Sequence, residues 1–318
     1  MNSEQQYIDL YLQAQELICR HSSPLMNSRR QEAFEAFRQS GFPGRQAERY
    51  KYTDVAQVFS PDYGLNLSRL DIPVNPYEVF RCDVPNLSTS LYFVLNDQFY
   101  DKALPKVQLP DGVIVSSLNK ASVQHPKLLE RCYGRLARSG KDAINALNTM
   151  LAQDGLLVYV PRGVVVDRTI QVVNILRADV DLMVNRRVLV VLEDGAQARI
   201  LVCDHALDDR NFLATQVSEI FVGENAHLEL YELEETHVKC RRMSNMYVQM
   251  QANSTAVLDS ITLQNGLTRN RADVRLDGPG AEVYMNGCVI ADQKQHVDNN
   301  TLIDHAAAHC QSHQLYKY

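Results

Sequence analysis

Four side chains near the end of the sequence have the types that bind transition metals: His305, His309, Cys310 and His313. Imidazole nitrogen and thiolate sulfur are common ligands of zinc and iron. The three histidines are four residues apart, so they share a face in either a strand or a helix. The alternative is that the histidines line an outward face while Cys310 packs as a small apolar residue. The sequence thus offers a candidate metal site, which depends on geometry that spacing does not fix.

A second candidate is an acidic run, Glu229, Glu232, Glu234 and Glu235, followed by His237. Paired carboxylates are the catalytic groups of enzymes that cleave glycosidic bonds. Runs of charge are more often the solvated face of a strand. We therefore keep both interpretations and prefer the solvated face.

Motifs of several nucleotide-dependent and hydrolytic enzymes do not occur in the sequence. It has no phosphate-binding GxxxxGK[ST], no dinucleotide-binding GxGxxG and no GxSxG nucleophile elbow. We therefore expect that the chain does not hydrolyse ATP by itself.

The seven cysteines are dispersed, odd in number and without a CxxC pair. This usage is typical of a reduced, cytoplasmic protein and not of a disulfide framework. Cys203, Cys240 and Cys288 are isolated in sequence, and we expect each to be a buried structural thiol.

Charge and hydropathy exclude two classes of partner. The 318 residues carry a formal charge of −6, with a pI near 5.9. A nucleic-acid binder or a protein docked on an anionic membrane needs a basic surface. The longest apolar runs, such as 156–160 and 188–192, have five residues, against roughly twenty for a membrane span. The polar N-terminus does not have the pattern of a secretory signal, so we expect a cytoplasmic protein.

The elements that would position these residues follow a repeated frame between Tyr159 and Cys310. In its clearest copy, at 191–198, an apolar residue is followed five positions later by a small one, with a turn former between them. The small positions are 164, 196, 226, 255, 281 and 308, with steps of 32, 30, 29, 26 and 27 residues. A period of this size, with two strands in each repeat, predicts a β-solenoid. A two-sheet jelly roll is the rival fold, since it also uses many short strands.

The frame also predicts corner residues. Gly195, Asn225, Ser254 and Gly280 would form tight turns, because Gly and Asn tolerate positive φ. The small residues that follow them, Ala196, Ala226, Thr255 and Ala281, would stack just inside the corners.

The first half of the chain has a different pattern. Apolar spacing predicts helices within 5–40 and 118–152, and short strands at 91–95 and 113–115. Residues 60–90 are rich in Pro, Asn and Ser and indicate an irregular connector. Segment 45–53 interleaves charged and aromatic residues, which suits either a ligand patch or a surface segment with packed tyrosines. We therefore divide the chain into a mainly helical region, 1–152, with a few short strands, and a β region, 153–318.

Three groups of residues, taken in order, resemble the SufB/SufD family of iron–sulfur cluster assembly proteins, and within it the SufD branch. They are Gly41-Phe42-Pro43 with Glu48 to Thr53; Leu147-Asn148, Asp154-Gly155 and Val158 to Val164; and Arg269-Asn270-Arg271, Leu276 to Ala281, Gly287, His296, Asp298, Thr301, His305, Ser312, Tyr316 and Lys317.

The resemblance implies a mainly β fold: a right-handed parallel β-helix (β-solenoid) core after an N-terminal helical α/β region. It implies a non-catalytic scaffold subunit of a SufBCD-type complex, which pairs with a SufB-like subunit and binds a SufC-like ABC-type ATPase. No cofactor is implied for the chain alone, and an iron–sulfur cluster is implied only in the assembled complex. The alternatives are a β-helix carbohydrate-active enzyme and a purely structural, self-associating solenoid.

The sequence departs from the family where it stops, at Tyr318. Family members continue for roughly another hundred residues, a large part of an ordinary domain. We therefore expect the β-helix core to be truncated at its C-terminal end, without the part that pairs with SufB and binds SufC. A homodimer through the open end is the alternative partner.

Overall fold

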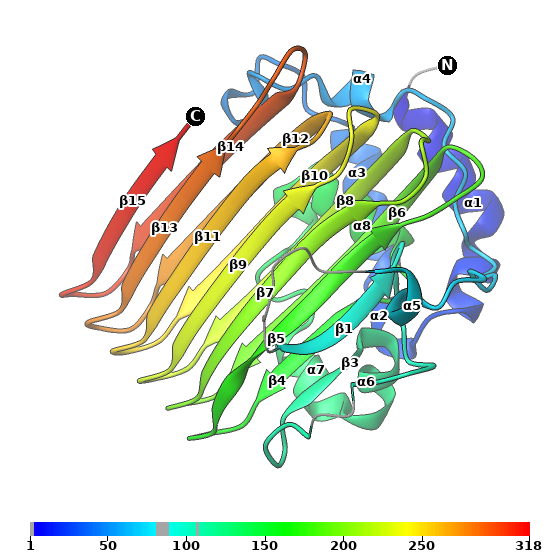
Figure 1. Ribbon diagram of the computed structural model, residues 1–318. Helices are drawn as coiled ribbons and strands as arrows, with labels where there is room; N and C mark the ends of the chain where they lie inside the picture. The colour runs from blue at the N-terminus through cyan, green and yellow to red at the C-terminus, as the bar shows by residue number, and fades with distance from the viewer. Residues whose placement is uncertain (1–2, 81–88, 106–107) are drawn as a thin grey trace.

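The computed structural model describes residues 3–80, 89–105 and 108–318. In this part of the chain two sheets face each other and form a β-solenoid of about six turns from residue 156 onward. The strand order is β15-β13-β11-β9-β7-β5-β1-β2 in the eight-stranded sheet and β14-β12-β10-β8-β6-β4-β3 in the seven-stranded sheet. From β4 onward, successive strands therefore alternate between the sheets, and the coils stack side by side (Figure 1).

The strands of the solenoid are long, and shorter strands precede them. Their bounds are β1 Thr89–Leu95, β2 Gln98–Phe99, β3 Ile114–Ser117, β4 Leu156–Val160, β5 Val165–Leu176, β6 Leu182–Leu192, β7 Gln197–Ala206, β8 Phe212–Val222, β9 His227–Glu235, β10 Cys240–Met250, β11 Thr255–Gln264, β12 Leu267–Leu276, β13 Glu282–Val289, β14 His296–His305 and β15 Gln311–Lys317.

The helices all precede the solenoid coils in sequence. Their bounds are α1 Ser3–Arg20, α2 Pro24–Asn27, α3 Arg30–Ser40, α4 Val55–Phe59, α5 Pro76–Val79, α6 Leu118–Gln124, α7 Pro126–Cys132 and α8 Ala143–Leu151, with 3-10 turns η1 Glu48–Tyr50 and η2 Ser139–Lys141.

Parallel pairing confirms the solenoid and excludes the jelly roll. From β4 to β15 every neighbouring pair in each sheet is parallel, for example β8 with β10 from Phe212↔Cys240 to Val222↔Met250. A jelly roll is built from antiparallel strands. The fixed register places residues of the same type above one another in successive coils, which is why the repeat is visible in the sequence.

The corners explain the period. A residue with positive φ forms one corner of each coil, at Gly163, Gly195, Asn225, Asn253, Gly280 and His309; Gln293, in the loop between β13 and β14, also has positive φ. The residue after each corner turns inward, and Ala196, Ala226 and Ala281 are buried there as predicted. Gly and Asn fill five of these six corners because they enter the left-handed region at little cost.

Two predicted corners are displaced. Asn253, not Ser254, has the positive φ, and Ser254 is the buried small residue while Thr255 is half-buried. Three consecutive small or polar residues made the phase ambiguous by one position. In the sixth copy the corner is His309 and the following small residue is Cys310, so Ala308 is not the inward position.

Ala226→Leu should destabilise the protein by about 1–3 kcal/mol, because the corner has no room for three more carbon atoms. Ala226 is 2% exposed and packs in the main core. Thermal or urea unfolding measures the change. Glu224→Leu, at an exposed position of the same corner, is the matched control and should change stability by less than about 0.5 kcal/mol. Equal stability of the two variants would contradict the assigned corner.

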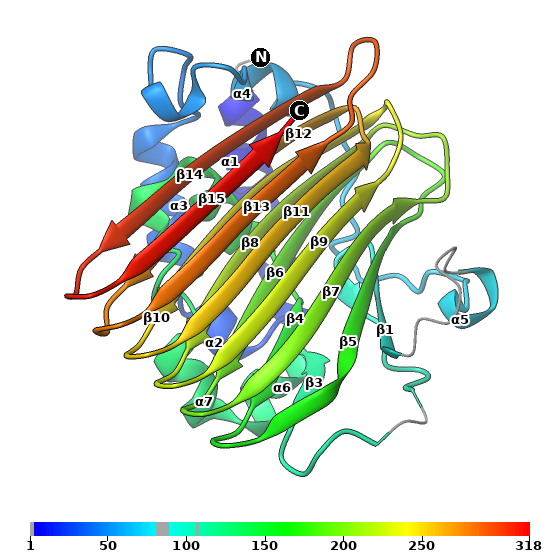
Figure 2. The same ribbon diagram turned by 60° about the vertical axis from the view of Figure 1, so that its left-hand side comes forward.

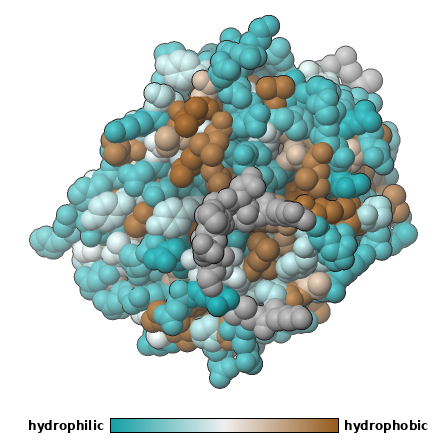
Figure 3. All heavy atoms as spheres, in the orientation of Figure 1, coloured by the Kyte–Doolittle hydropathy of each residue, from teal (hydrophilic) through white to brown (hydrophobic). Residues whose placement is uncertain are grey.

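Most helices cover the outer face of the seven-stranded sheet and lie behind both sheets in Figure 2. Helix α5 is the exception, since its Tyr77 packs on Phe93 of the eight-stranded sheet. Helix α8 contacts β6, β8 and β10. Its apolar residues share a core with α1, α3 and with Met183, Leu213 and Met243 of the sheet. The opposite, eight-stranded sheet faces the viewer in Figure 2, and the surface over its later coils, at the left of Figure 3, is mainly hydrophilic.

A buried carboxylate, Glu219, attaches the segment between α7 and α8 to the sheet. Glu219 of β8 accepts hydrogen bonds from the backbone N–H groups of Gly134 (2.8 Å), Leu136 (2.8 Å) and Ala137 (3.1 Å). It also accepts one from Arg187 of β6 at 2.7 Å, and both side chains are 1% exposed. One carboxylate therefore joins the loop and the solenoid.

The helix and strand predictions for the first half are confirmed, within the usual shifts of a few residues at element ends. Residues 118–152 form α6, α7 and α8, and strands β1 and β3 match 91–95 and 113–115. The predicted connector 60–90 contains α5, and its residues 81–88 lie outside the described part. In segment 45–53, Tyr50 is buried, and the Arg269 guanidinium carbon lies 3.9 Å from the centre of its ring. Tyr52 is exposed.

Candidate functional site

The four predicted metal ligands have separate surroundings. His305 Nε2 lies 2.9 Å from Ser312 Oγ, and His313 stacks on Tyr284 with its Nε2 3.5 Å from Glu282 Oε1. Cys310 Sγ donates to the carbonyl of Gly278 at 3.3 Å. Over the described residues, no three His, Cys, Asp or Glu side chains could hold a metal ion together.

The reason lies in the turn between β14 and β15. The prediction placed His305, His309 and His313 in one continuous helix or strand. Instead, His305 ends a strand of one sheet and His313 belongs to a strand of the other, with the corner residue His309 between them. The corner breaks the alternation on which the shared face depended.

The acidic run divides between the two faces of β9. Leu228 and Leu230 point into the solenoid, and Glu232 and Glu234 continue the same alternation. Glu229 and Glu235 lie on the opposite, solvent side, where Glu229 pairs with Arg199 at 2.6 Å. The solvated-face interpretation therefore holds for Glu229 and Glu235, and it is wrong for Glu234, which is 2% exposed.

Five charged residues from both sheets meet inside the solenoid; we call them the interior charged cluster: Arg186, Asp204, Glu232, Glu234 and Arg242. Arg186 Nη1 lies 2.5 Å from Asp204 Oδ1. Arg242 lies between three carboxylates, 3.1 Å from Glu232, 3.6 Å from Asp204 and 4.0 Å from Glu234. Each charge has an opposite partner, as burial at this depth requires.

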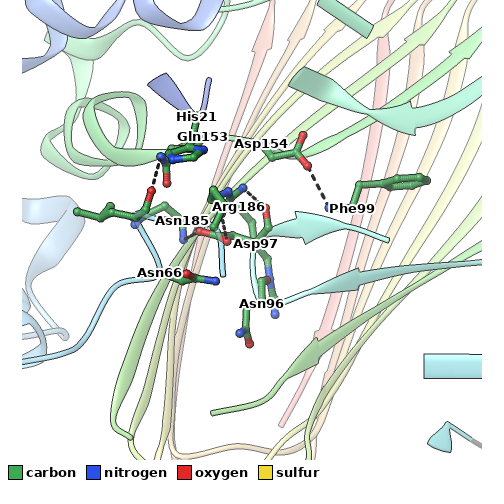
Figure 4. A network of polar contacts seen from close by, with 12 residues as sticks. His21, Asn66, Asn96, Asp97, Phe99, Gln153, Asp154, Asn185 and Arg186 are labelled. Atoms are coloured by element: carbon green, nitrogen blue, oxygen red, sulfur yellow. Dashed lines mark hydrogen bonds and ion pairs between the residues drawn. The ribbon is translucent and has the colours of Figure 1, made fainter. Parts of the chain in front are cut away.

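The cluster is connected to the turn that joins β1 and β2. Arg186 Nε donates to the carbonyl of Asn96 at 2.8 Å, and Asp97 accepts from the backbone N–H of Asn185 at 3.3 Å (Figure 4). Beside them, Asp154 accepts from the backbone N–H of Phe99 at 3.1 Å (Figure 4). The β1–β2 hairpin is therefore joined to the solenoid interior by hydrogen bonds.

The charges of the cluster balance only when one carboxyl holds a proton. Burial alone raises the pKa of Asp204, but Arg242 and Arg186 outweigh it and hold the pKa below its usual value. Burial raises the pKa of Glu234 to about 7, against the opposing effects of Arg242 and the Thr268 hydroxyl. With Glu234 protonated, two arginines face two carboxylates, and this neutral arrangement suits a low-dielectric interior.

Two small cavities, of about 20 and about 40 Å³, adjoin the cluster, and Glu232 lines both. Arg186 Nη2 and Gln216 Oε1 at the first cavity, and Asn270 Oδ1 at the second, are buried atoms without a hydrogen-bond partner among the described residues. A cavity of this size holds one or a few waters. The unpartnered donors and acceptors therefore suit water or a ligand of similar size. The cavities are too small for a sugar.

The isolated cysteines differ in exposure. Cys203 and Cys240 are buried as predicted, whereas Cys288 is exposed because the alternation of β13 points its neighbours Gly287 and Val289 inward. Cys240 Sγ lies 3.6 Å from His237 Nε2, which resembles a nucleophile–base pair. Burial raises the pKa of Cys240 to about 11, so the group remains a thiol near neutral pH and is a weak nucleophile.

Comparison with known protein families decides the classification. The family model described as the SufBD protein N-terminal region matches residues 1–172, and the model described as the SUF system FeS cluster assembly SufBD core domain matches residues 175–318. The chain belongs to the SufBD family. The two matches account for nearly every residue, and they do not distinguish SufB from SufD.

The individual SufBD proteins that the chain matches share only low sequence identity with it, or match it over a short stretch. The chain is 23% identical over 308 residues to "Protein ABCI7, chloroplastic" of Arabidopsis thaliana, covering 93% of this chain and 62% of that protein. It is 29% identical over 121 residues to the "Iron-sulfur cluster assembly SufBD family protein slr0074" of Synechocystis, covering 37% of this chain and 25% of that protein. It is 40% identical over 58 residues to the SufBD family protein ML0594 of Mycobacterium leprae, covering 18% of this chain and 15% of that protein. The matched part thus spans less than two thirds of each of these proteins.

Sequence reasoning missed the interior charged cluster of this SufBD chain. The available signal was the alternation itself: Glu232 and Glu234 follow Leu228 and Leu230 at steps of two residues. We treated the acidic residues as one run, and so did not separate the two faces of the strand. Across the described ranges, no helix has the length and apolar character needed to cross a membrane.

Proposed function

We propose that this SufBD chain acts as a SufD-like, non-catalytic scaffold subunit in a cytoplasmic SufBCD-type complex. In this proposal it pairs with a SufB-like subunit and binds a SufC-like ABC-type ATPase. The iron–sulfur cluster is the cargo of the assembled complex and not a resident group of this chain.

The observation that carries the proposal is the match of both SufBD family models over residues 1–172 and 175–318. The names of the relatives support the process, since slr0074 and ML0594 are called iron–sulfur cluster assembly proteins. A holding role fits the structure, because the coils are joined by continuous parallel pairing. The helical region is attached by the buried Arg271–Asp142 ion pair and by the backbone hydrogen bonds to Glu219. Such a body keeps surfaces at fixed positions along its length.

The interior geometry weighs against a carbohydrate-active enzyme. Glu232 and Glu234 face a closed interior with Arg242, and the neighbouring cavities are about 20 and about 40 Å³. A glycosidase needs two carboxylates on either side of a glycosidic bond, in a cleft that admits a sugar ring. Turnover of acidic polysaccharides by the purified protein would favour the enzyme interpretation over the scaffold.

The experiment that tests the proposal is co-expression of the gene's complete product with SufB-like and SufC-like proteins from the same organism. We expect a stable complex of all three on size-exclusion chromatography, and faster ATP hydrolysis than by the SufC-like protein alone. An unrelated ABC-type ATPase from the same organism is the control and should not join the complex.

Two results would contradict the scaffold proposal. The first is that neither the SufB-like nor the SufC-like protein binds. The second is that the product forms only assemblies of itself, which would instead support the self-associating solenoid.

A further inference from the structure

The segment Arg131 to Lys141, which we call the basic loop, has a charge opposite to that of the whole chain. It contains Arg131, Arg135, Arg138 and Lys141 and no acidic residue, although the formal charge of the protein is −6. Arg131 pairs with Glu193. In the described part of the chain no carboxylate pairs with Arg135, Arg138 or Lys141, and all three side chains are exposed. Three unpaired cations within seven residues create a local positive potential, which attracts negatively charged groups of a partner.

The basic loop is held in one conformation. Glu219 accepts the backbone N–H groups of Gly134, Leu136 and Ala137, and Ala137 packs against Val217 and Tyr247 of the sheet. The exposed cations therefore extend from a backbone that is already ordered, which lowers the entropic cost of binding through them.

A groove of about 560 Å³ lies between the basic loop and the outer face of the seven-stranded sheet. Arg135, Arg138 and Lys141 form one wall. On the opposite side, Asp277 and Asp304 are paired with Arg275, at 2.5 and 2.7 Å. One guanidinium thus faces two carboxylates on that side, and Asp273, also at the groove, pairs with Arg271. The one remaining negative charge is outweighed by the three loop cations, so the groove has a net positive charge.

The groove also has apolar positions and a defined length. Leu136 and Phe221 are half-buried in it, and Leu302 is 43% exposed. Phe221, Gln249, Arg275 and Asp304 are register partners on four successive strands. Three strand spacings amount to roughly 14 Å, which is the length of about four extended residues.

We propose that this groove binds an extended acidic segment of a partner protein, with apolar side chains among its carboxylates. The carboxylates would pair with Arg135, Arg138 and Lys141, and the apolar side chains would contact Leu136, Phe221 and Leu302. The proposal does not depend on the iron–sulfur role, since it follows from the charge and shape of the groove alone.

A phosphate or nucleotide is a poorer occupant. Phosphate sites in proteins are commonly built from free backbone N–H groups at a turn or helix N-terminus. The N–H groups of Gly134, Leu136 and Ala137 are already bound to Glu219. The cations therefore act as separate side-chain charges along an elongated groove, an arrangement that matches several carboxylates in a row.

The test uses a fluorescein-labelled peptide of about ten residues, alternating Asp or Glu with Leu or Phe, and fluorescence anisotropy on the full chain. We expect saturable binding that weakens with added salt, because exposed charge pairs are screened. The triple variant Arg135→Glu, Arg138→Glu, Lys141→Glu should lose about tenfold or more in affinity. The matched control changes the net charge equally at exposed positions elsewhere: Arg168→Glu, Arg210→Glu, Lys294→Glu. Its affinity for the peptide should stay within about twofold of the wild-type value.

A second variant separates the groove from general electrostatics. Leu302→Asp should weaken peptide binding several-fold, because it removes an apolar contact and adds a repelling charge. Circular dichroism of each variant shows whether the fold is kept. The proposal is overturned if the triple variant binds as the wild type does, if a peptide with Lys in place of the acids binds equally well, or if pyrophosphate or ATP displaces the peptide more effectively than the unlabelled peptide.

Discussion

Replacing Glu219 by alanine should destabilise the protein by about 3–5 kcal/mol, the loss typical of a broken buried ion pair. The change leaves Arg187 charged and buried without a carboxylate partner, and it removes the acceptor of three backbone N–H groups in the basic loop. Each unsatisfied buried donor adds its own desolvation penalty. Urea unfolding at neutral pH measures the change in midpoint and in free energy of unfolding.

Two companion variants make this prediction specific. Arg187→Met should be less damaging than Glu219→Ala, since Glu219 then still accepts the three backbone N–H groups. Glu193→Ala removes the partner of Arg131, an exposed ion pair, and should cost less than about 1 kcal/mol. If Glu219→Ala lost no more stability than Glu193→Ala, the central role of Glu219 in attaching the loop would be refuted.

The stability of the protein should fall as pH rises from about 4.5 to above 7, because of Glu234. Its pKa is raised by burial from 4.5 to about 7 in the folded protein. The folded state therefore binds more protons than the unfolded state between these values, and the free energy of unfolding falls with pH in that interval. A shift of this size corresponds to roughly 3 kcal/mol at 1.36 kcal/mol per unit. Urea unfolding at several pH values from 4.5 to 8.5 measures it.

The control for this pH effect is a neutral isostere. Glu234→Gln cannot titrate and should remove this contribution, so its stability should depend less on pH than that of the wild type. Glu235→Gln changes the exposed neighbour on the other face of β9 and should leave the slope intact. Identical pH profiles for wild type and Glu234→Gln would show that Glu234 is not the titrating group.

The number of coils could be predicted from the sequence, but the corner residue was misplaced in two of them. Gly195, Asn225 and Gly280 were placed correctly, because in each case a Gly or Asn directly precedes a single alanine that fits inside the corner. Asn253 is followed by Ser254 and Thr255, and any of the three suits a tight turn. The choice is made by which residue fits inside the corner, and that depends on the coils above and below.

The candidate metal site shows the same dependence on the fold. The spacing of His305, His309 and His313 places them on one face only if they belong to one continuous helix or strand. The corner at His309 ends β14, and β15 continues in the opposite sheet. Residues four apart in sequence therefore contact different neighbours: Ser312 for His305 and Tyr284 for His313.

The β-solenoid, the helices before it and the family could be predicted from the sequence, because they depend on periodic patterns, local turn chemistry and short motifs. The interior charged cluster and the groove could not. Glu234 has a raised pKa because the neighbouring coils and the opposite sheet bury its carboxyl group. Arg135, Arg138 and Lys141 became the wall of a groove because Glu219, on a strand far away in sequence, holds their backbone in place. Both outcomes arise from contacts between residues distant in sequence, which local patterns do not encode.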